Sequence, residues 1–333
     1  MEEKMISILI PAHHAAATLR SAVESALKGS KKCRTEILLM DDGADDDTSA
    51  LCRDLMREYD TVRVHKMQDR GVSAARNLAM DKASGDYICF LDADDRILPG
   101  GLDVLYDILT QTHADAAGGT FVTGVQDTDC PDEEAAPAAG DLQELAGEAF
   151  VRDGILQRDT HVWGKLFRKE AAGVCRFSEG MTIGEDMLYL LSLAGEKEDF
   201  RIVRTQTPVW FYRLNPKGAM ERPYTKSFYD QIRCWERAEK KIRQYFPLLF
   251  QKEEVYTQFQ RTRLVTAMLV PGKIIRLPAK AQEEFKEDYE NARACVQTLY
   301  HDPDVRRALE PQERVKALLF LSFPRLYKRV FGV

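Results

Sequence analysis

Apolar runs alternate with mixed segments over the first hundred residues of the chain. Residues 5–11, 35–40 and 87–91 are rich in apolar side chains, which is typical of strands buried on both faces of a parallel sheet. Residues 61–67 alternate valine with charged neighbours and predict a more exposed edge strand. The segments between the strands have apolar residues at helical spacing and predict helices at 15–27, 48–59 and 71–83. This alternation indicates a parallel α/β sheet with right-handed crossovers.

The pattern becomes less regular after the first hundred residues. The acidic, proline-containing segment 126–140, QDTDCPDEEAAPAAG, has almost no large apolar residue and predicts a surface loop. The other elements predicted in this part are helices at 102–109 and 141–154 and strands at 114–124, 200–203 and 208–213.

The last third of the chain is predicted to be helical. From residue 225 onward the helical pattern is interrupted near Pro247, Pro271, Pro278 and Pro303. We therefore predict an α/β domain at 1–220, which contains the acidic loop, and a helical C-terminal region at 221–333.

Composition narrows the class of protein. The 333 residues are 44% hydrophobic and 30% charged, as in an ordinary globular protein, and the net charge of −6 argues against a nucleic-acid binder. The N-terminus has no signal-peptide pattern, and no apolar run approaches the length of a membrane span. The seven cysteines form no CxxC pair, which favours reduced thiols and a cytoplasmic location.

Three carboxylates follow the most apolar strand directly. Asp92, Asp94 and Asp95 end the segment DYICFLDADD. Ligands of open α/β sheets bind beyond the carboxyl ends of the strands, and Mn²⁺ or Mg²⁺ prefers carboxylate oxygens. A solvated acidic turn is the alternative for such a short motif.

Other polar residues are expected at the same edge of the sheet. Asp41 and Asp42 close the strand at 35–40, where a carboxylate can accept a hydrogen bond from a nucleobase or a ribose, or simply form a turn. Arg76 belongs to GVSAARN, whose small side chains allow a ligand to come close, and it either binds phosphate or pairs with these carboxylates. Glu185 and Asp186 begin a predicted helix, either as caps that favour its dipole or as a general base.

Seven segments together resemble the family 2 glycosyltransferases with the GT-A fold. They occur in the family's order across about residues 5–220, and the ordered set is far more specific than any single motif. The resemblance implies a GT-A fold with a mainly parallel twisted sheet flanked by helices, a nucleotide-sugar donor, a divalent metal ion (Mn²⁺ or Mg²⁺) and inversion at the anomeric carbon. The segments are ILIPAHHAAATL, LLMDDGADD, DRGVSAARN, DYICFLDADD, VWGKLFRKE, IGEDMLYLL and WFYRLNPKGAM.

The resemblance also implies a role for individual residues of the donor site. Pro11 and Ala12 would border the nucleobase, and Asp42, with Asp41 beside it, would bind uracil or another base, with a UDP-sugar favoured. Arg76 would lie beside the nucleotide. The expected ribose and metal–diphosphate ligands are Asp92 and Asp94, and the expected phosphate-loop residues are Arg213 and Lys217.

The acceptor side follows from the same resemblance. Asp186 would be the catalytic base and Glu185 would orient the site, while Trp163 and Lys165 would line the acceptor cleft. The sequence departs from the usual family pattern at His13, His14, Ala44 and Ala219, which affects the base-binding and phosphate-loop segments.

The C-terminal end combines basic and apolar residues. Residues 314–331 contain five lysines or arginines and no acid, so they predict either binding to an anionic membrane surface or packing against the helical region or a dimer partner.

The predicted function is therefore transfer of a sugar from a nucleotide-diphosphate donor to a glycan or lipid-linked acceptor in cell-surface polysaccharide synthesis. The location is expected to be the cytoplasm or the inner membrane face. A non-catalytic protein that binds nucleotide sugars is the main alternative. A nucleotidyltransferase would require a glycine-rich basic loop after the first strand, where this chain has alanine and histidine.

Overall fold

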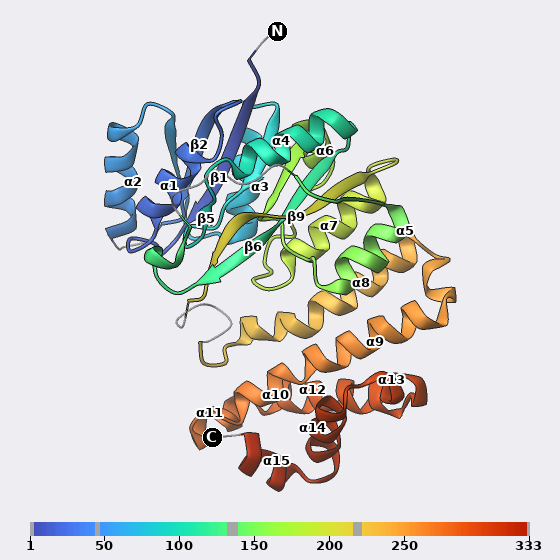
Figure 1. Ribbon diagram of the computed structural model, residues 1–333. Coiled ribbons are helices and arrows are strands. Elements are labelled where there is room, and N and C mark those ends of the chain that lie inside the picture. The colour runs from blue at the N-terminus through green and yellow to red at the C-terminus, as the bar shows by residue number, and fades with distance from the viewer. Residues whose placement is uncertain (1–2, 44–46, 132–138, 216–221, 332–333) are drawn as a thin grey trace.

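The N-terminal half of the sheet follows the predicted alternation. The computed structural model describes residues 3–43, 47–131, 139–215 and 222–331. Four parallel strands are ordered β3-β2-β1-β4, with β3 at the edge as expected. Figure 1 labels β1 and β2 of this group, in the blue part of the ribbon. The predicted elements are confirmed as β1 (Met5–Ala12), α1 (Leu19–Lys28), β2 (Arg34–Asp41), α2 (Asp47–Glu58), β3 (Val62–Lys66), α3 (Val72–Lys82) and β4 (Tyr87–Phe90).

The rest of the sheet is mixed. A strand absent from the prediction, β8 (Lys165–Arg168), lies antiparallel between β4 and β6 (Ala116–Gly124). The strand β6 then pairs in parallel with β9 (Arg201–Arg213), which also pairs with the two-residue strand β5 (Arg96–Ile97). The predicted strands at 200–203 and 208–213 are one continuous strand, and register shifts along its pairing with β6 explain the broken sequence pattern.

The helix predicted at 141–154 is wrong in its first half. Leu142–Ala146 forms β7, which pairs antiparallel with β9, and only then do α5 (Gly147–Ala149) and two short helical turns to Gln157 follow. The local sequence could not reveal this strand, because its partner β9 lies more than fifty residues further along the chain. The helix predicted at 102–109 is confirmed as α4 (Gly101–Thr112).

Two hydrophobic layers cover the two faces of the sheet. Ile88 and Phe90 of β4 pack into the layer that contains α3 and α7 (Glu185–Glu196). Cys89 and Leu91 point the other way, into the layer that contains α1 and α4. Burial on both faces explains why this strand has no polar position before Asp92.

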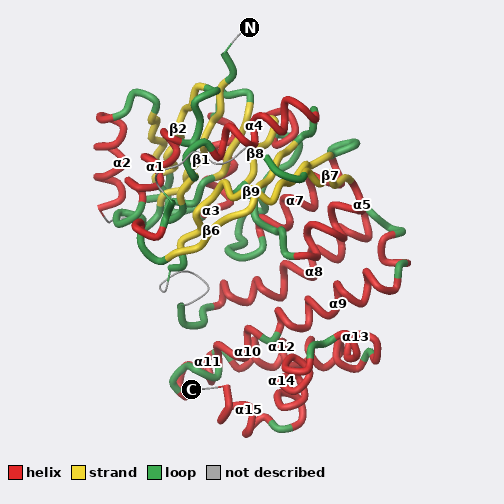
Figure 2. Tube along the Cα trace, in the orientation of Figure 1, coloured by secondary structure: helices red, strands yellow, loops and turns green. Residues whose placement is uncertain are grey.

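The C-terminal part is helical, as predicted, and lies beneath the sheet (Figure 2). Its first two helices, α8 and α9, supply Trp235 and Phe259 to the layer around α7. A third hydrophobic cluster then joins the remaining helices. No helix in the described ranges is both long and apolar enough to cross a membrane. The helices are α8 (Asp230–Tyr245), α9 (Glu253–Ala267), α10 (Leu269–Ile274), α11 (Ala279–Glu284), α12 (Lys286–His301), α13 (Pro303–Ala308), α14 (Pro311–Ser322) and α15 (Pro324–Phe331).

Candidate active site

One buried arginine connects the two groups of predicted acidic residues. Arg76 lies on α3, is 3% exposed, and donates from one terminal nitrogen to Asp92 at 2.9 Å. Its other terminal nitrogen donates to Asp186 at 2.7 Å and to Glu185 at 3.1 Å. Arg76 therefore holds the end of β4 and the first turn of α7 together, although these residues lie about a hundred positions apart.

Gly184 allows α7 to begin beside this arginine. It has a φ of +83°, and a Cβ atom there would lie 2.4 Å from the Cβ of Cys234 on α8. Only glycine fits both the backbone conformation and the contact. The first turn of α7, which carries Glu185 and Asp186, can therefore lie against α8 and still face Arg76.

Opposing effects set the ionisation of the cluster. Burial raises the pKa of Asp186 to about 7; Arg76 opposes the rise, while Glu185 and Asp92 add to it. Burial also disfavours the charge of Arg76, but the three carboxylates outweigh this effect and raise its pKa. Asp186 also accepts a hydrogen bond from the backbone N–H of Val162 at 3.1 Å. A carboxyl that titrates near neutrality and is fixed at both oxygens suits a general base.

The three acids after β4 have different environments. Asp95 is buried and accepts hydrogen bonds from Trp210 Nε1 at 3.1 Å and from the backbone N–H of Arg213 at 3.0 Å, so it joins this turn to β9. Burial, with the nearby charge of Asp92, raises the pKa of Asp95 to about 8.

Among the described residues, Asp94 has the weakest hydrogen-bond support of the three acids. Its closest side-chain donor is Asn215 Nδ2, at 3.5 Å. Burial and the charge of Asp92 raise the pKa of Asp94. A divalent cation would relieve this repulsion, so the oxygen-donor set fits Mn²⁺ or Mg²⁺.

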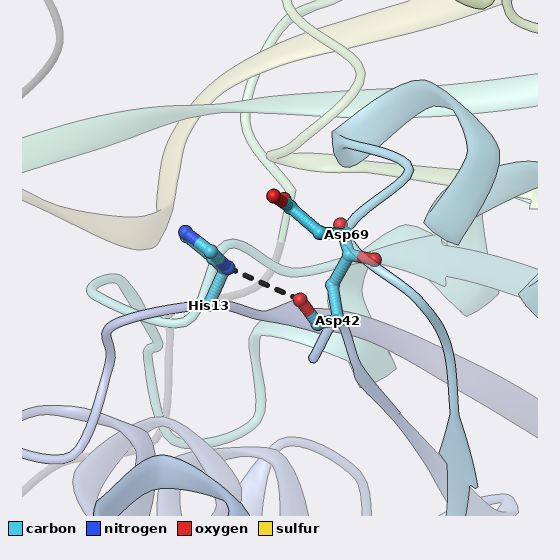
Figure 3. A group of neighbouring side chains, drawn as sticks. All are labelled: His13, Asp42 and Asp69. Atoms are coloured by element: carbon cyan, nitrogen blue, oxygen red, sulfur yellow. Dashed lines mark hydrogen bonds between the residues drawn. The ribbon is translucent and has the colours of Figure 1, made fainter. Parts of the chain in front are cut away.

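Asp42 lies at the end of β2, beside the start of α3. Its two carboxylate oxygens accept hydrogen bonds from the backbone N–H groups of Arg70 at 2.9 Å and Gly71 at 2.8 Å. Its backbone carbonyl is 3.2 Å from His13 Nδ1. Asp42, His13 and Asp69 also bring three possible metal-ligand atoms within 4.8 Å of one another (Figure 3). This second acidic group lies at the carboxyl end of β2, where the nucleobase was predicted to bind.

The neighbours of Asp42 have structural contacts. Asp41 is buried and accepts a hydrogen bond from Ser49 Oγ at 2.7 Å, which ties β2 to α2. Ala12 is buried, and its carbonyl accepts the backbone N–H of Asp42 at 3.1 Å. Pro11 and Ala12 thus end β1 directly beside the acidic edge of β2.

Trp163 lies in an aromatic stack beside the carboxylates. Its ring stacks on His161 with centroids 4.3 Å apart and on Tyr212 at 5.3 Å, while Phe121 meets it edge-on at 5.1 Å. Burial raises the pKa of Tyr212, and the charges of Asp95, Asp94 and Asp92 add to the rise. The next residue, Arg213, donates its backbone N–H to Asp95 at 3.0 Å, so this end of the stack lies beside the acids. Phe121 is 45% exposed and offers an open aromatic surface.

Lys165 supports this stack from inside the protein. It is 4% exposed, and its amine donates to Asp159 at 2.5 Å and to the carbonyl of His161 at 2.7 Å. Arg204 pairs with the other oxygen of Asp159 at 3.1 Å. Lys165 therefore fixes the loop that carries His161 and Trp163, and its amine has protein partners already.

Arg213 braces the acidic turn. Its Nε donates to the carbonyl of Asp94 at 2.8 Å, and its terminal nitrogens contact the carbonyl of Val125 and the carboxylate of Asp127. The other predicted phosphate-loop residue, Lys217, and the departures at Ala44 and Ala219 lie outside the described residues.

Sequence reasoning missed the open aromatic surface. Phe121 and Tyr212 lie on β6 and β9, whose register brings these strands together, and no local motif marks either residue. Two cavities that the structure does contain lie in the helical region, one beside Arg261 and Leu156 and the other between α10 and α14. The candidate active site is the edge of the sheet at the carboxyl ends of its strands, where the acidic residues lie, and this edge is called the rim below.

The fold and this rim place the protein in the class of α/β folds whose ligands bind beyond the carboxyl ends of the strands. Residues 7–134 match the family described as Glycosyl transferase family 2. The similarity extends to S. aureus TarS 1-349, whose crystal structure aligns with a TM-score of 0.63 at 15% identity over 99% of this chain and 88% of that one. Residues 7–134 are therefore similar to family 2 glycosyltransferases, and the chain as a whole has the GT-A-like fold of TarS 1-349.

Curated relatives share only part of their length with this chain. Glycosyltransferase GlyA of Streptococcus pneumoniae is 24% identical over 67% of this chain and 32% of its own length. The uncharacterized glycosyltransferase EpsJ of Bacillus subtilis is 25% identical over 68% of this chain and 66% of its own length. A GalNAc(5)-diNAcBac-PP-undecaprenol beta-1,3-glucosyltransferase of Campylobacter jejuni is 28% identical over 60% of this chain and 64% of its own length. The chain thus spans between about a third and two thirds of these relatives.

Proposed function

We propose that the protein is an inverting, metal-dependent glycosyltransferase, which moves a sugar from a nucleotide-diphosphate donor to a hydroxyl group of a glycan or lipid-linked acceptor. The observation that carries the proposal is the Arg76 cluster. It joins the expected ribose ligand Asp92 to the expected base Asp186, so that donor and acceptor chemistry meet at one rim. Nothing in the comparisons favours the alternative of a non-catalytic binding protein.

The donor site is proposed along the edges of β1, β2 and β4. Asp42, which is fixed by two backbone N–H groups, would accept a hydrogen bond from the nucleobase, and Asp92 would accept one from the ribose. Pro11, Ala12 and Asp41 would form the wall beside the base. A uridine nucleotide is favoured, because a related crystal structure is that of TarS 1-349 in complex with UDP-GlcNAc.

Asp94 is the proposed ligand of Mn²⁺ or Mg²⁺, because burial and the charge of Asp92 raise its pKa and a bound cation would offset both effects. A bound cation would stabilise the negative charge that grows on the departing nucleoside diphosphate. Arg213 holds the backbone of Asp94 in place from β9 and would position it for this role.

Asp186 is the proposed base. It would take the proton of the acceptor hydroxyl, whose oxygen then forms a bond to the anomeric carbon as the bond to the diphosphate breaks. This single displacement inverts the anomeric centre and requires no covalent enzyme intermediate. Glu185 would orient the site by sharing Arg76.

The acceptor would lie over the aromatic stack, because that stack adjoins both the metal carboxylates and the loop that donates to Asp186. The exposed ring of Phe121, which packs edge-on against the buried Trp163, offers an apolar surface to a sugar ring. A glycan or lipid-linked acceptor and a role in cell-surface polysaccharide synthesis are proposed because one relative acts on an undecaprenol-linked glycan. A lipid-linked acceptor would also require the protein to act at the inner membrane face, which it would contact through residues 314–331.

A donor screen tests the proposal. We expect one nucleotide sugar, presented with Mn²⁺, to raise the melting temperature and to release nucleoside diphosphate slowly in the absence of acceptor. Asp94→Ala should remove the effect of Mn²⁺ on both readouts, whereas Asp153→Ala, a control at an exposed surface ion pair, should not. Donor binding without any turnover in the presence of acceptor glycans would favour the non-catalytic alternative instead.

A further inference from the structure

An apolar cavity lies at the far end of the helical region from the sheet. It has a volume of about 620 Å³, within the range of about 300–1,000 Å³ that is typical of small-molecule sites. The helices α9, α10, α14 and α15 form its walls. Its lining is mainly apolar and includes Val265, Met268, Leu269, Val315 and Phe331.

One lysine faces this apolar lining without an acidic partner among the described residues. Lys316 on α14 lines the cavity, and its amine lies 5.5 Å from the centre of the Phe331 ring. Arg276 is close by, because its Nε donates to the carbonyl of Phe331 at 3.3 Å. Burial lowers the pKa of Lys316, and the charge of Arg276 lowers it further. An ammonium group in such surroundings gains stability when an anion binds beside it.

The acid nearest in sequence does not supply that anion. Glu313 also lines the cavity, but both of its carboxylate oxygens accept hydrogen bonds from Arg261, at 3.1 Å. From Arg314 to the end of the chain there is no Asp or Glu. The cavity therefore has an unpaired positive charge at Lys316, a carboxylate at Glu313 that Arg261 neutralises, and a lining that is otherwise mainly apolar among the described residues.

The surface around the cavity continues the same pattern. Val315 on α14, Phe323 between the two helices and Val330 on α15 are each more than 50% exposed, and Arg325 and Arg329 lie on α15. A second copy of this chain would bring like charges together, so the surface favours a partner of opposite charge. An apolar chain alone binds such surfaces weakly, and a basic patch supplies the second attraction.

We propose that this cavity binds the hydrocarbon chain of an anionic amphiphile, a lipid with a phosphate head group, and that Lys316 and Arg276 contact the phosphate. The site is separate from the carboxylate rim, and its occupancy does not depend on the proposed transfer reaction. It gives the C-terminal helices a specific ligand, which is a narrower role than general attraction to a membrane surface.

Titration of the full chain with dioctanoyl phosphatidic acid below its critical micelle concentration, followed by calorimetry, tests this. We expect saturable binding that Lys316→Gln weakens about tenfold, because a hydrogen bond to a charged group is lost. Leu269→Trp should abolish binding by filling the cavity. Lys240→Gln, which changes an exposed lysine on α8, is the matched control and should leave the affinity unchanged.

Two further ligands identify what the site recognises. Dioctanoyl phosphatidylcholine should bind at least tenfold more weakly, and inorganic phosphate at millimolar concentration should not compete. The proposal is overturned if Lys316→Gln and Leu269→Trp, both with melting temperatures near that of the parent, bind phosphatidic acid as the parent does. It is also overturned if inorganic phosphate displaces the lipid, because the apolar cavity would then play no part.

Discussion

Two regions of this molecule handle charge in opposite ways. At the rim of the sheet, Arg76 is almost fully buried and shares its two terminal nitrogens among three carboxylates. At the C-terminal helices, Lys316 lies beside an aromatic ring, and the last twenty residues contain no acid. The first arrangement fixes groups in place before a substrate arrives, while the second leaves charge available for a ligand from outside. Removing a charge should therefore reduce stability and transfer strongly at the rim, and should hardly change either at the C-terminal helices.

The largest effect is expected for Asp186→Asn. The amide keeps the shape of the side chain but cannot take a proton, so transfer should fall by about 10³-fold, within the range of general-base contributions. Donor binding, measured by thermal shift, should persist. Asp153→Asn is the matched surface control. Retention of near-parent transfer by Asp186→Asn would assign the base to another residue.

The next effect concerns stability. Arg76→Gln leaves three buried or half-buried carboxylates without their cation, so the free energy of unfolding should fall by ~3–5 kcal/mol, and transfer should be lost as well. Chemical denaturation at neutral pH measures the change. Arg57→Gln, at an exposed ion pair on α2, should change stability by less than ~1 kcal/mol. Equal losses from both variants would remove the contrast between buried and exposed charge.

The pH dependence of transfer follows from Asp186. Its folded pKa of about 7 lies above the ordinary value of 3.8, so the base is protonated in acid, and kcat/KM should rise as the pH increases through about 7. The stability that the protonated form contributes is fully present below pH ~4 and is lost as the pH rises to about 7.

Two variants assign this limb of the pH profile. Arg76→Lys, which keeps a cation but loses the paired geometry, should move the limb to higher pH because the opposing interaction weakens. Asp95→Asn should leave it in place, although the pKa of Asp95 is also raised, to about 8. Loss of the limb in Asp95→Asn would show that it reports the titration of Asp95 and not that of Asp186.

A smaller effect is expected at the aromatic surface. Phe121→Ala removes an exposed ring, so the KM for acceptor should rise about five- to tenfold while donor affinity stays constant. Phe121→Tyr should restore it. Leu248→Ala, at a more exposed apolar residue just after the end of α8, serves as the control. A change in donor affinity would show that Phe121 contacts the donor and not the acceptor.

The smallest effect is expected at the terminal helices. Lys316→Gln should leave donor hydrolysis in water unchanged within twofold, and its free energy of unfolding should change by less than ~0.5 kcal/mol. Donor hydrolysis and denaturation, measured together, check this. A large loss of either would show that Lys316 supports the fold or the rim.

The sequence by itself determined the part of the fold that depends on local pattern. Apolar runs such as 87–91 alternate with segments of helical spacing, and this pattern predicted β1 to β4 and α1 to α3. Strands buried on both faces need uninterrupted apolar runs. The prolines and the helical spacing predicted the C-terminal helices. The carboxylates were also visible, because polar residues directly after buried strands stand out.

Tertiary structure alone decided which of these residues meet. β7 was predicted as helix because its pairing partner β9 is distant in sequence, and β8 was missed because its four residues become a strand only between β4 and β6. Three features join segments that are distant in the sequence. They are the link between Asp92 and Asp186 through Arg76, the stack of Phe121 and Tyr212 on Trp163, and the cavity at Lys316. Local patterns encode the propensity and burial of each segment, but long-range packing brings the reactive side chains of different segments together.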